Sequence, residues 1–447
     1  MKNKDKHIYI SVYLHSKGFV PAGVVVFNQD HGYAGFSYFS SYIENDYPPL
    51  NPATLNWREG NRKFFVVNHE QNKQMLDRTF WEMLPNQNDW GNQVLVSRYP
   101  EYSSMNNAEK LYFLGSRVVG GLSSYVKEKN FEESVNSIDW LDKIRAESID
   151  LFMNNIDKIT HIRAINPLTS YGGVRPKCMF EDEKGDFWIA KFNLPNDPYD
   201  MAIAEHTALQ MSADMGLNTS ESKVLRLPSG ENVFLSKRFD RDGEKRFHSL
   251  SLFSLAPGNE VVKRNLFAPG NPGGFIQTLI KRYSDFESMD SLNVVTKMLL
   301  DIGVNNTDNH LRNIRIILNR NHKWELAPIY DVVFNPASQN HTYNPAGLPL
   351  KDLYLNNPNI IGALSQEHNV KPHLIEEKLN IAKKVLNNWE DYCDNNNMTH
   401  EDKMKVGNAI SLGLNRKELE YRSTKEHNLT QNKKFLIEAP KLKPKNM

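Results

Sequence analysis

The sequence is poor in cysteine, with only Cys178 and Cys393 in a chain of 447 residues. Two thiols cannot form a disulfide framework, and they cannot supply a four-cysteine zinc site. Both are expected to be buried thiols rather than reactive ones. This cysteine usage is typical of a protein that works in a reducing cytoplasm.

An excess of charge of either sign is also missing, since 54 basic residues stand against 53 acidic ones. A net charge of +1 provides no general attraction to nucleic acid or to an anionic membrane, so such binding would need a local patch. No run of about 18 apolar residues occurs, and no apolar stretch follows the lysines of residues 1–9 as a secretory signal requires. We therefore expect a cytoplasmic protein without a membrane-spanning segment.

What is present indicates a folded chain of several units. Hydrophobic residues make up 40% and charged residues 24%, which is typical of globular proteins. The length exceeds what one hydrophobic core usually organises. The patterns predict an N-terminal α+β domain (1–126), a helical connector (127–164), a small sheet with one helix (165–245), a mainly helical lobe (246–423) and a polar, lysine-rich tail (424–447).

The sheet of the third unit is predicted from apolar alternation and turn residues. A hairpin is expected over 177–180 and 187–192, and two more strands over 222–227 and 232–239. An amphipathic helix over 201–216 lies between these two pairs. Beyond residue 241 the apolar period becomes helical, most clearly over 292–302, 374–389 and 403–412.

The segment 306–313 carries the strongest chemical signal, because it follows a predicted helix and precedes a strand-like stretch. Phosphoryl transfer needs a carboxylate that orients the attacking hydroxyl and an oxygen ligand that holds Mg²⁺. Asp308 and Asn313 fit these two roles, and Asp331 can supply a second metal ligand. The plainer interpretation is that Asp308 is a turn residue and Asp331 a helix cap.

Two upstream features fit a nucleotide. Lys191 ends an apolar strand, where its ammonium needs a phosphate or a carboxylate such as Glu205, unless it simply reaches water. The loop 170–177, with Ser170, Gly172, Gly173 and Lys177, offers flexible backbone and cations that suit a polyphosphate. Glycine pairs are more often plain turns, and this loop has neither the Walker pattern nor the G-x-G-x-x-G pattern.

The order of these parts is more informative than any one of them. A phosphate loop, a strand lysine, a helix glutamate, an Asp…Asn loop and a metal aspartate follow one another as in a kinase. The sequence therefore predicts an α+β, atypical bilobal protein-kinase-like fold. Residues 165–245 would form its N-lobe with the ATP-binding sheet, and 246–423 its helical C-lobe.

The segments 170–177, 190–192, 204–206, 237–241, 306–313 and 327–331 together resemble the HipA family of serine/threonine kinases, the toxins of bacterial type II toxin–antitoxin pairs. The firm part of the resemblance covers about residues 165–335. Residues 83–85 and 115–122 resemble the family's N-terminal domain in a more diverged form.

The resemblance implies that Asp308 is the catalytic aspartate, supported by His310 and Arg312, and that Asn313 and Asp331 bind Mg²⁺. It further implies that Lys191 contacts the phosphates of ATP, that the strand from Lys237 to Phe239 borders adenine, and that Ser170 is autophosphorylated.

A small helix-turn-helix antitoxin is also implied as a partner, with DNA reached only through it. The implied substrate is a protein of translation, such as an aminoacyl-tRNA synthetase. Two alternatives stay open: a lipid or small-molecule kinase of the same fold, and a co-regulator with little kinase activity that binds the antitoxin or its operator complex.

Overall fold

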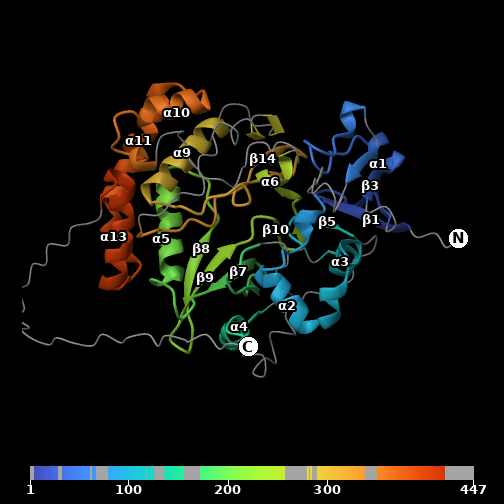
Figure 1. The fold of residues 1–447 in the computed structure, drawn as a ribbon, viewed down its shortest axis with the longest axis horizontal. Helices are drawn as coiled ribbons and strands as arrows, with labels where there is room; N and C mark the ends of the chain where they lie inside the picture. Colours follow the sequence, from blue (N-terminus) through green and yellow to red (C-terminus); the bar gives the residue numbers. More distant parts are fainter. Residues whose placement is uncertain are drawn as a thin grey trace, which may run out of the picture.

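The computed structural model describes residues 5–28, 33–60, 63–66, 79–116, 118–124, 135–155, 172–256, 279–280, 282–283, 289–337 and 350–417. Ser170 and the predicted tail 424–447 lie outside these residues. In Figure 1 a sheet at the N-terminal end and a group of helices from the C-terminal part flank a central sheet.

The N-terminal sheet is antiparallel, with strand order β4-β3-β2-β1-β5. Alternate residues of β1 (Ile8, Ile10, Val12 and Leu14) are buried, as expected for a strand with one face on a core. The strands are β1 (Asp5–Leu14), β2 (Gly18–Asn28), β3 (Tyr33–Tyr38), β4 (Lys63–Val66) and β5 (Leu122–Ser123). The helical segments here are α1 (Ser40–Glu44), η1 (Trp57–Glu59), η2 (Trp81–Met83), α2 (Trp90–Arg98), η3 (Pro100–Ser104) and α3 (Asn107–Leu114).

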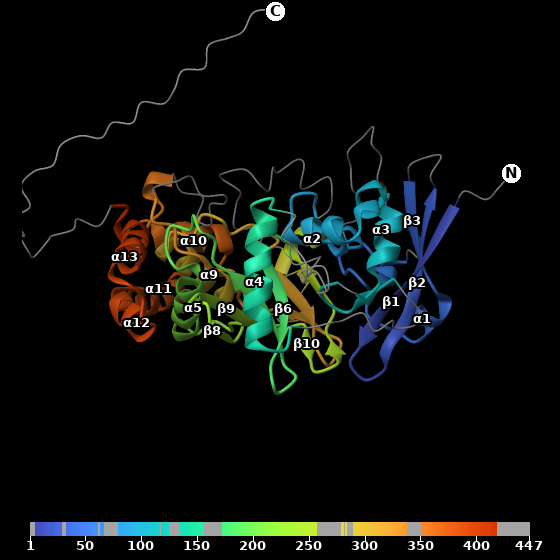
Figure 2. The ribbon, with the colours of Figure 1, turned by 90° about the horizontal axis from the view of Figure 1, so that it is seen from below.

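The central sheet is also antiparallel, with order β6-β7-β9-β8. Its strands are β6 (Lys177–Glu181), β7 (Phe187–Phe192), β8 (Ser222–Arg226) and β9 (Asn232–Lys237). Two helices cover it, α5 (Met201–Asp214) and α4 (Ile138–Phe152), the latter beside β6 in Figure 2. Along β9, Val233 and Leu235 join the core that contains α4, whereas Phe234 joins the core that contains α5. The sheet is therefore buried on both faces.

The C-terminal helices share one core with α5. They are α9 (Met289–Gly303), α10 (Ile360–His368), α11 (Pro372–Asn387), α12 (Trp389–Asn395) and α13 (His400–Asn415), and a short η5 (Leu350–Asp352) precedes them. This arrangement agrees with the helical pattern of the sequence.

The predicted helical lobe also contains a third sheet, β12-β13-β14, which the helical sequence pattern does not indicate. Its strands are β12 (Ser249–Ser251), β13 (Arg315–Leu318) and β14 (Trp324–Leu326), and a β10–β11 hairpin (Arg241–Asp242, Lys245–Arg246) and α6 (Leu252–Leu255) lie nearby. Leu250, Ile316 and Trp324 belong to the same hydrophobic core as the N-terminal sheet. The N-terminal domain is thus joined to the C-terminal half by continuous apolar packing, while the predicted domain limits stay predictions.

A buried ion cluster reinforces this junction. Asp240 is fully buried and accepts hydrogen bonds from Arg238, from Arg241 and from the backbone N–H of Gly120. Arg241 also donates to the carbonyl of Val118. Although burial raises the pKa of Asp240, the two guanidinium groups lower it far more, so the carboxylate stays charged.

Within the described residues, no helix combines the length and the apolar character needed to cross a membrane.

The contact between α13 and α9 depends on a glycine. A Cβ at Gly413 would lie 2.1 Å from the carbonyl oxygen of Gly303, whereas a Cβ at Gly362 in α10 has no atom within 4 Å. We expect Gly413→Ala to lower the free energy of unfolding by about 2 kcal/mol or more, because two packed backbones must separate. Gly362→Ala, the matched control, should leave it unchanged or raise it by about 0.5–1 kcal/mol. Urea denaturation of both variants measures this, and equal effects would contradict it.

Candidate active site

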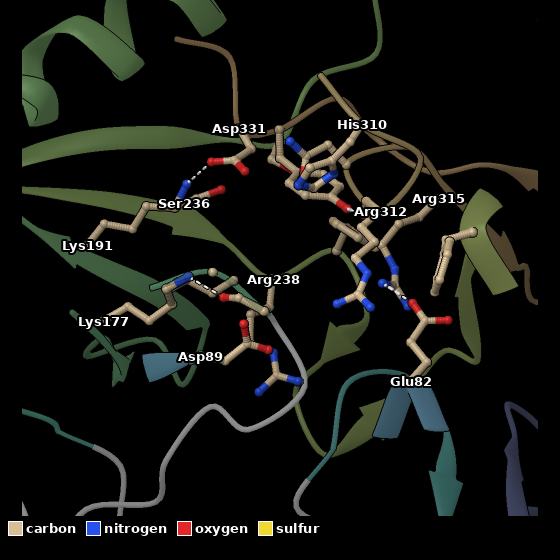
Figure 3. A pocket seen from close by; sticks show the side chains of 18 of the residues that line it. Glu82, Asp89, Lys177, Lys191, Ser236, Arg238, His310, Arg312, Arg315 and Asp331 are labelled. Atoms are coloured by element: carbon tan, nitrogen blue, oxygen red, sulfur yellow. Dashed lines mark hydrogen bonds and ion pairs between the residues drawn. The ribbon is translucent and has the colours of Figure 1, made fainter. Parts of the chain in front are cut away.

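One cavity of about 430 Å³ lies where the central sheet, the loop after α9 and the N-terminal domain meet (Figure 3). Nearly all the predicted site residues that the structure describes line it: Gly172, Gly173, Lys177, Lys191, Lys237, Phe239, Asp308, His310, Arg312, Asn313 and Asp331. Glu205 does not line the cavity but contacts the lining residue Lys191. Ser170 falls outside the described residues. Residues more than 130 positions apart in the chain are therefore brought to one site.

Lys191 is held between two carboxylates. Its Nζ lies 2.7 Å from Glu205 Oε1 on α5 and 2.7 Å from Asp331 Oδ1, so the predicted partner is present. Burial lowers the pKa of Lys191, but Asp331 and Glu205 outweigh it and raise the pKa above its usual value. For Asp331 burial acts in the opposite direction and raises the pKa, but the ammonium of Lys191 outweighs burial and lowers this pKa to about 2. Both groups are ionised at neutral pH.

The backbone at Asp331 is in the left-handed region, with φ 59°. Such a conformation costs energy for a residue with a side chain and is often found at functional sites. The preceding Tyr330 fixes this segment, since its hydroxyl donates to the carbonyl of Arg312 at 3.0 Å and its ring packs 5.6 Å from that of Phe239. The strained residue thereby directs its carboxylate toward Lys191.

The loop that carries Asp308 and Asn313 is anchored by Asp301, which the sequence pattern did not single out. Asp301 is buried at the end of α9 and accepts hydrogen bonds from the side chains of Lys297, Asn306 and Asn309. Within the loop, Asn313 Nδ2 donates to the carbonyl of Asp308 at 3.1 Å. The geometry of this loop thus depends on the buried hydrogen bonds around Asp301.

Asp308 is an exposed residue at the edge of the cavity, where its carboxylate is accessible to a ligand. Partial desolvation of its carboxylate by the surrounding cavity wall raises the pKa of Asp308; the neighbouring His310 lowers this pKa, and Asp331 raises it. The Nδ1 atom of His310 is buried and has no hydrogen-bond partner among the described residues. Arg312 stacks on Phe253, with its guanidinium carbon 4.8 Å from the ring centre.

The glycine-bearing loop is shaped by Gly172 and Gly173, which have φ values of 61° and 78°. Lys177 donates from Nζ to the carbonyl of Gly172 at 2.6 Å. Burial lowers the pKa of Lys177 to about 8, and the nearby Lys191 adds to this effect. Arg175 is paired with Asp197 through both guanidinium nitrogens, which fixes the far side of the loop.

Lys237, expected beside adenine, lies at the end of β9 with its Nζ 2.6 Å from Asp186 Oδ2. Its ammonium is therefore used in a salt bridge with the β6–β7 turn.

The N-terminal domain supplies part of the cavity wall that sequence patterns missed. Glu82, Leu84, Asn86 and Asp89 all line it. In Figure 3, Glu82 lies with Arg312 and Arg315 across the cavity from Lys191. Arg315 Nη1 lies 2.6 Å from Glu82 Oε1, a contact between residues 233 positions apart that no local pattern could reveal.

The donor set fits a magnesium ion. Asn313 and Asp331 line the same cavity and offer an amide and a carboxylate oxygen, and Mg²⁺ typically takes one or two such protein ligands together with phosphate oxygens. No cluster of three or more His, Cys, Asp or Glu ligands occurs in the described parts of the chain, so nothing there indicates a dedicated all-protein metal site.

Comparison with known proteins supports the class that fold and site define, a kinase-like α+β protein. Among solved structures, a chain of the HipA, HipB and operator DNA complex of the Shewanella oneidensis MR-1 toxin–antitoxin system matches with a TM-score of 0.64 and 14% identity, over 91% of this chain and 98% of that chain. The proinflammatory kinase CtkA of Helicobacter pylori matches with a TM-score of 0.37 and 13% identity over 53% of this chain and 89% of that chain, which is too distant to support an argument. A search of curated protein sequences found no match.

Residues 169–389 match the family model described as the HipA-like C-terminal domain, and this part of the chain belongs to the HipA family. The predicted family and fold class are thus confirmed. The roles of the individual site residues, ATP and Mg²⁺ stay predictions.

The Glu82–Arg315 pair leads to a test of pH-dependent stability. Burial raises the pKa of Glu82, but Arg315, Ser254 and Ser251 lower it overall. A lowered folded-state pKa means that the stabilisation is present above the unfolded pKa and is lost as pH falls through the folded one. Glu82→Gln should therefore cost about 3 kcal/mol at pH 7, where Arg315 loses its buried partner, and less at pH 3.

Urea denaturation at both pH values measures this difference. Glu101→Gln, at an exposed position of the same domain, is the matched control and should be neutral at both. A cost for Glu82→Gln that does not fall with pH would contradict the prediction.

Proposed function

We propose that this protein is an ATP- and Mg²⁺-dependent serine/threonine protein kinase of the HipA type. The observation that carries the proposal is the position of Lys191 between Glu205 and Asp331, in a cavity that Asp308 and Asn313 also line. A half-buried lysine held by two carboxylates beside an exposed aspartate is an arrangement suited to phosphoryl transfer from a nucleotide.

The residues of the cavity have separate roles in the proposed reaction. Lys191 and Lys177 provide positive charge toward phosphates, while Gly172 and Gly173 allow close approach of the backbone. Asp308 accepts a hydrogen bond from the acceptor hydroxyl and receives its proton. Asn313 and Asp331 hold Mg²⁺, which when bound neutralises phosphate charge. The segment from Lys237 to Phe239 borders the base.

The proposed acceptor is a protein hydroxyl, on an aminoacyl-tRNA synthetase or another protein of translation, and on Ser170 of the chain itself. A small helix-turn-helix antitoxin is the proposed partner, and DNA would be reached only through it. The solved complex that shares the fold contains HipB and operator DNA, which supports this proposal.

Asp308→Asn should reduce phosphate transfer from γ-labelled ATP by about 10²–10⁴-fold, since the hydroxyl loses its base. Asp331→Asn should abolish it, because the negative charge that faces both the metal and Lys191 is lost. Asp46→Asn is a matched control: Asp46 also has positive φ, 50° against 59° for Asp331, so Asn suits both backbones. Asp46 is exposed and outside the cavity, so its replacement should leave transfer unchanged.

The assay is run with and without bacterial lysate, followed by protein gel and lipid extraction. Label in the lipid fraction would favour a lipid kinase. Absence of transfer despite ATP binding would contradict the proposal and favour the co-regulator.

Autophosphorylation of Ser170 is expected to silence the enzyme, because about two negative charges next to Gly172 oppose the phosphates of ATP. Incubation of wild type with ATP and Mg²⁺ followed by mass spectrometry should find phosphate on Ser170, and Ser170→Ala should stay active for longer. Phosphate at other residues and none on Ser170 would show that this part is wrong.

A further inference from the structure

The glycine-bearing loop is held from outside the kinase-like domain. Trp90, the first residue of α2 in the N-terminal domain, donates its backbone N–H to the carbonyl of Gly173 at 3.0 Å. Its indole Nε1–H donates to the carbonyl of Lys177 at 2.8 Å. Together these two hydrogen bonds, the Trp90 contact, connect positions that are 83 and 87 residues apart.

The surroundings make this contact rigid. The Trp90 side chain is 1% exposed and belongs to the core of the central sheet, together with Cys178, Ala190 and Phe192. The first N–H groups of a helix have no partner within the helix, and at Trp90 the loop carbonyl takes that place. Asp89, just before it, lines the cavity.

Both ends of the contact adjoin the nucleotide-binding residues. Lys177 begins β6 and lies directly opposite Lys191 in the β6–β7 pairing. The hydrogen bond from Trp90 to the Lys177 carbonyl therefore fixes the position of β6 directly beside Lys191. The bond to Gly173 fixes the loop, where two glycines with positive φ otherwise permit many conformations.

We propose that Trp90 is a positioning residue for the nucleotide, which holds the loop 172–177 in the conformation that binds phosphate. A loop that is ordered before the ligand arrives does not lose conformational entropy when it binds. The inference rests on the proposed ATP-dependent function. It makes the N-terminal domain part of the nucleotide site, in addition to its contact through Glu82.

The test replaces Trp90 with Phe, which keeps an aromatic ring in the core and removes the indole N–H. Loss of one buried hydrogen bond should raise KM for ATP by about 3–10-fold with kcat nearly unchanged. Amide hydrogen exchange, measured without nucleotide, should become faster in peptides covering 172–181. Trp57→Phe is the matched control, since Trp57 donates its indole N–H to a backbone carbonyl, that of Tyr47, in the same domain at 3.2 Å. It should change neither readout.

If Trp90→Phe does not fold, site-specific incorporation of benzothienylalanine at position 90 removes the N–H and keeps the ring size. Unchanged KM, or a fall in kcat alone, overturns the inference even if exchange becomes faster. If wild type binds no ATP, the proposed function has failed and the nucleotide role of Trp90 fails with it. If wild type binds ATP and the variant binds it equally well, only the inference has failed.

Discussion

The site depends on the ammonium of Lys191 and the two carboxylates that face it. One carboxylate comes from α5, the other from a strained residue after β14, and the lysine itself comes from β7. Three elements from both halves of the kinase-like domain are thus joined at one charge. Removal of Lys191 would leave the carboxylates of Glu205 and Asp331 without the cation that pairs them, which is costly. The interaction explains why Asp331 can keep an unfavourable backbone conformation.

A second constraint is the integration of the N-terminal domain. Its core continues into the β12-β13-β14 sheet, the buried Asp240 cluster connects its Gly120 turn to the end of β9, and Glu82 pairs with Arg315 beside the loop of Asp308. With the Trp90 contact, these interactions connect the N-terminal domain to the C-terminal half and to the loops around the cavity. Such multiple attachment positions the N-terminal domain together with the residues that line the cavity.

Much of the central fold follows from local patterns. The 177–180 and 187–192 hairpin, the helix that begins at residue 201 and the helices near 292–302 and 374–389 appear close to their predicted limits, because their periodicity and turn residues agree. The short 3-10 helix η2 carries Glu82, whose side chain pairs with Arg315. This contact joins residues 233 positions apart, so local periodicity could not indicate it.

The sequence by itself determined the order of chemical groups: a glycine loop, a lysine on a strand, a glutamate on a helix, and an Asp…Asn loop followed by an aspartate. These are local choices, fixed by spacing within single elements. Only the tertiary structure decided that Asp301 anchors the loop, that Glu82 lines the cavity while Trp90 holds its glycine-bearing loop, and that Asp331 meets Lys191 across 140 residues. Contacts between distant segments are set by how sheets and helices pack, and that packing leaves no trace in the local pattern of either partner.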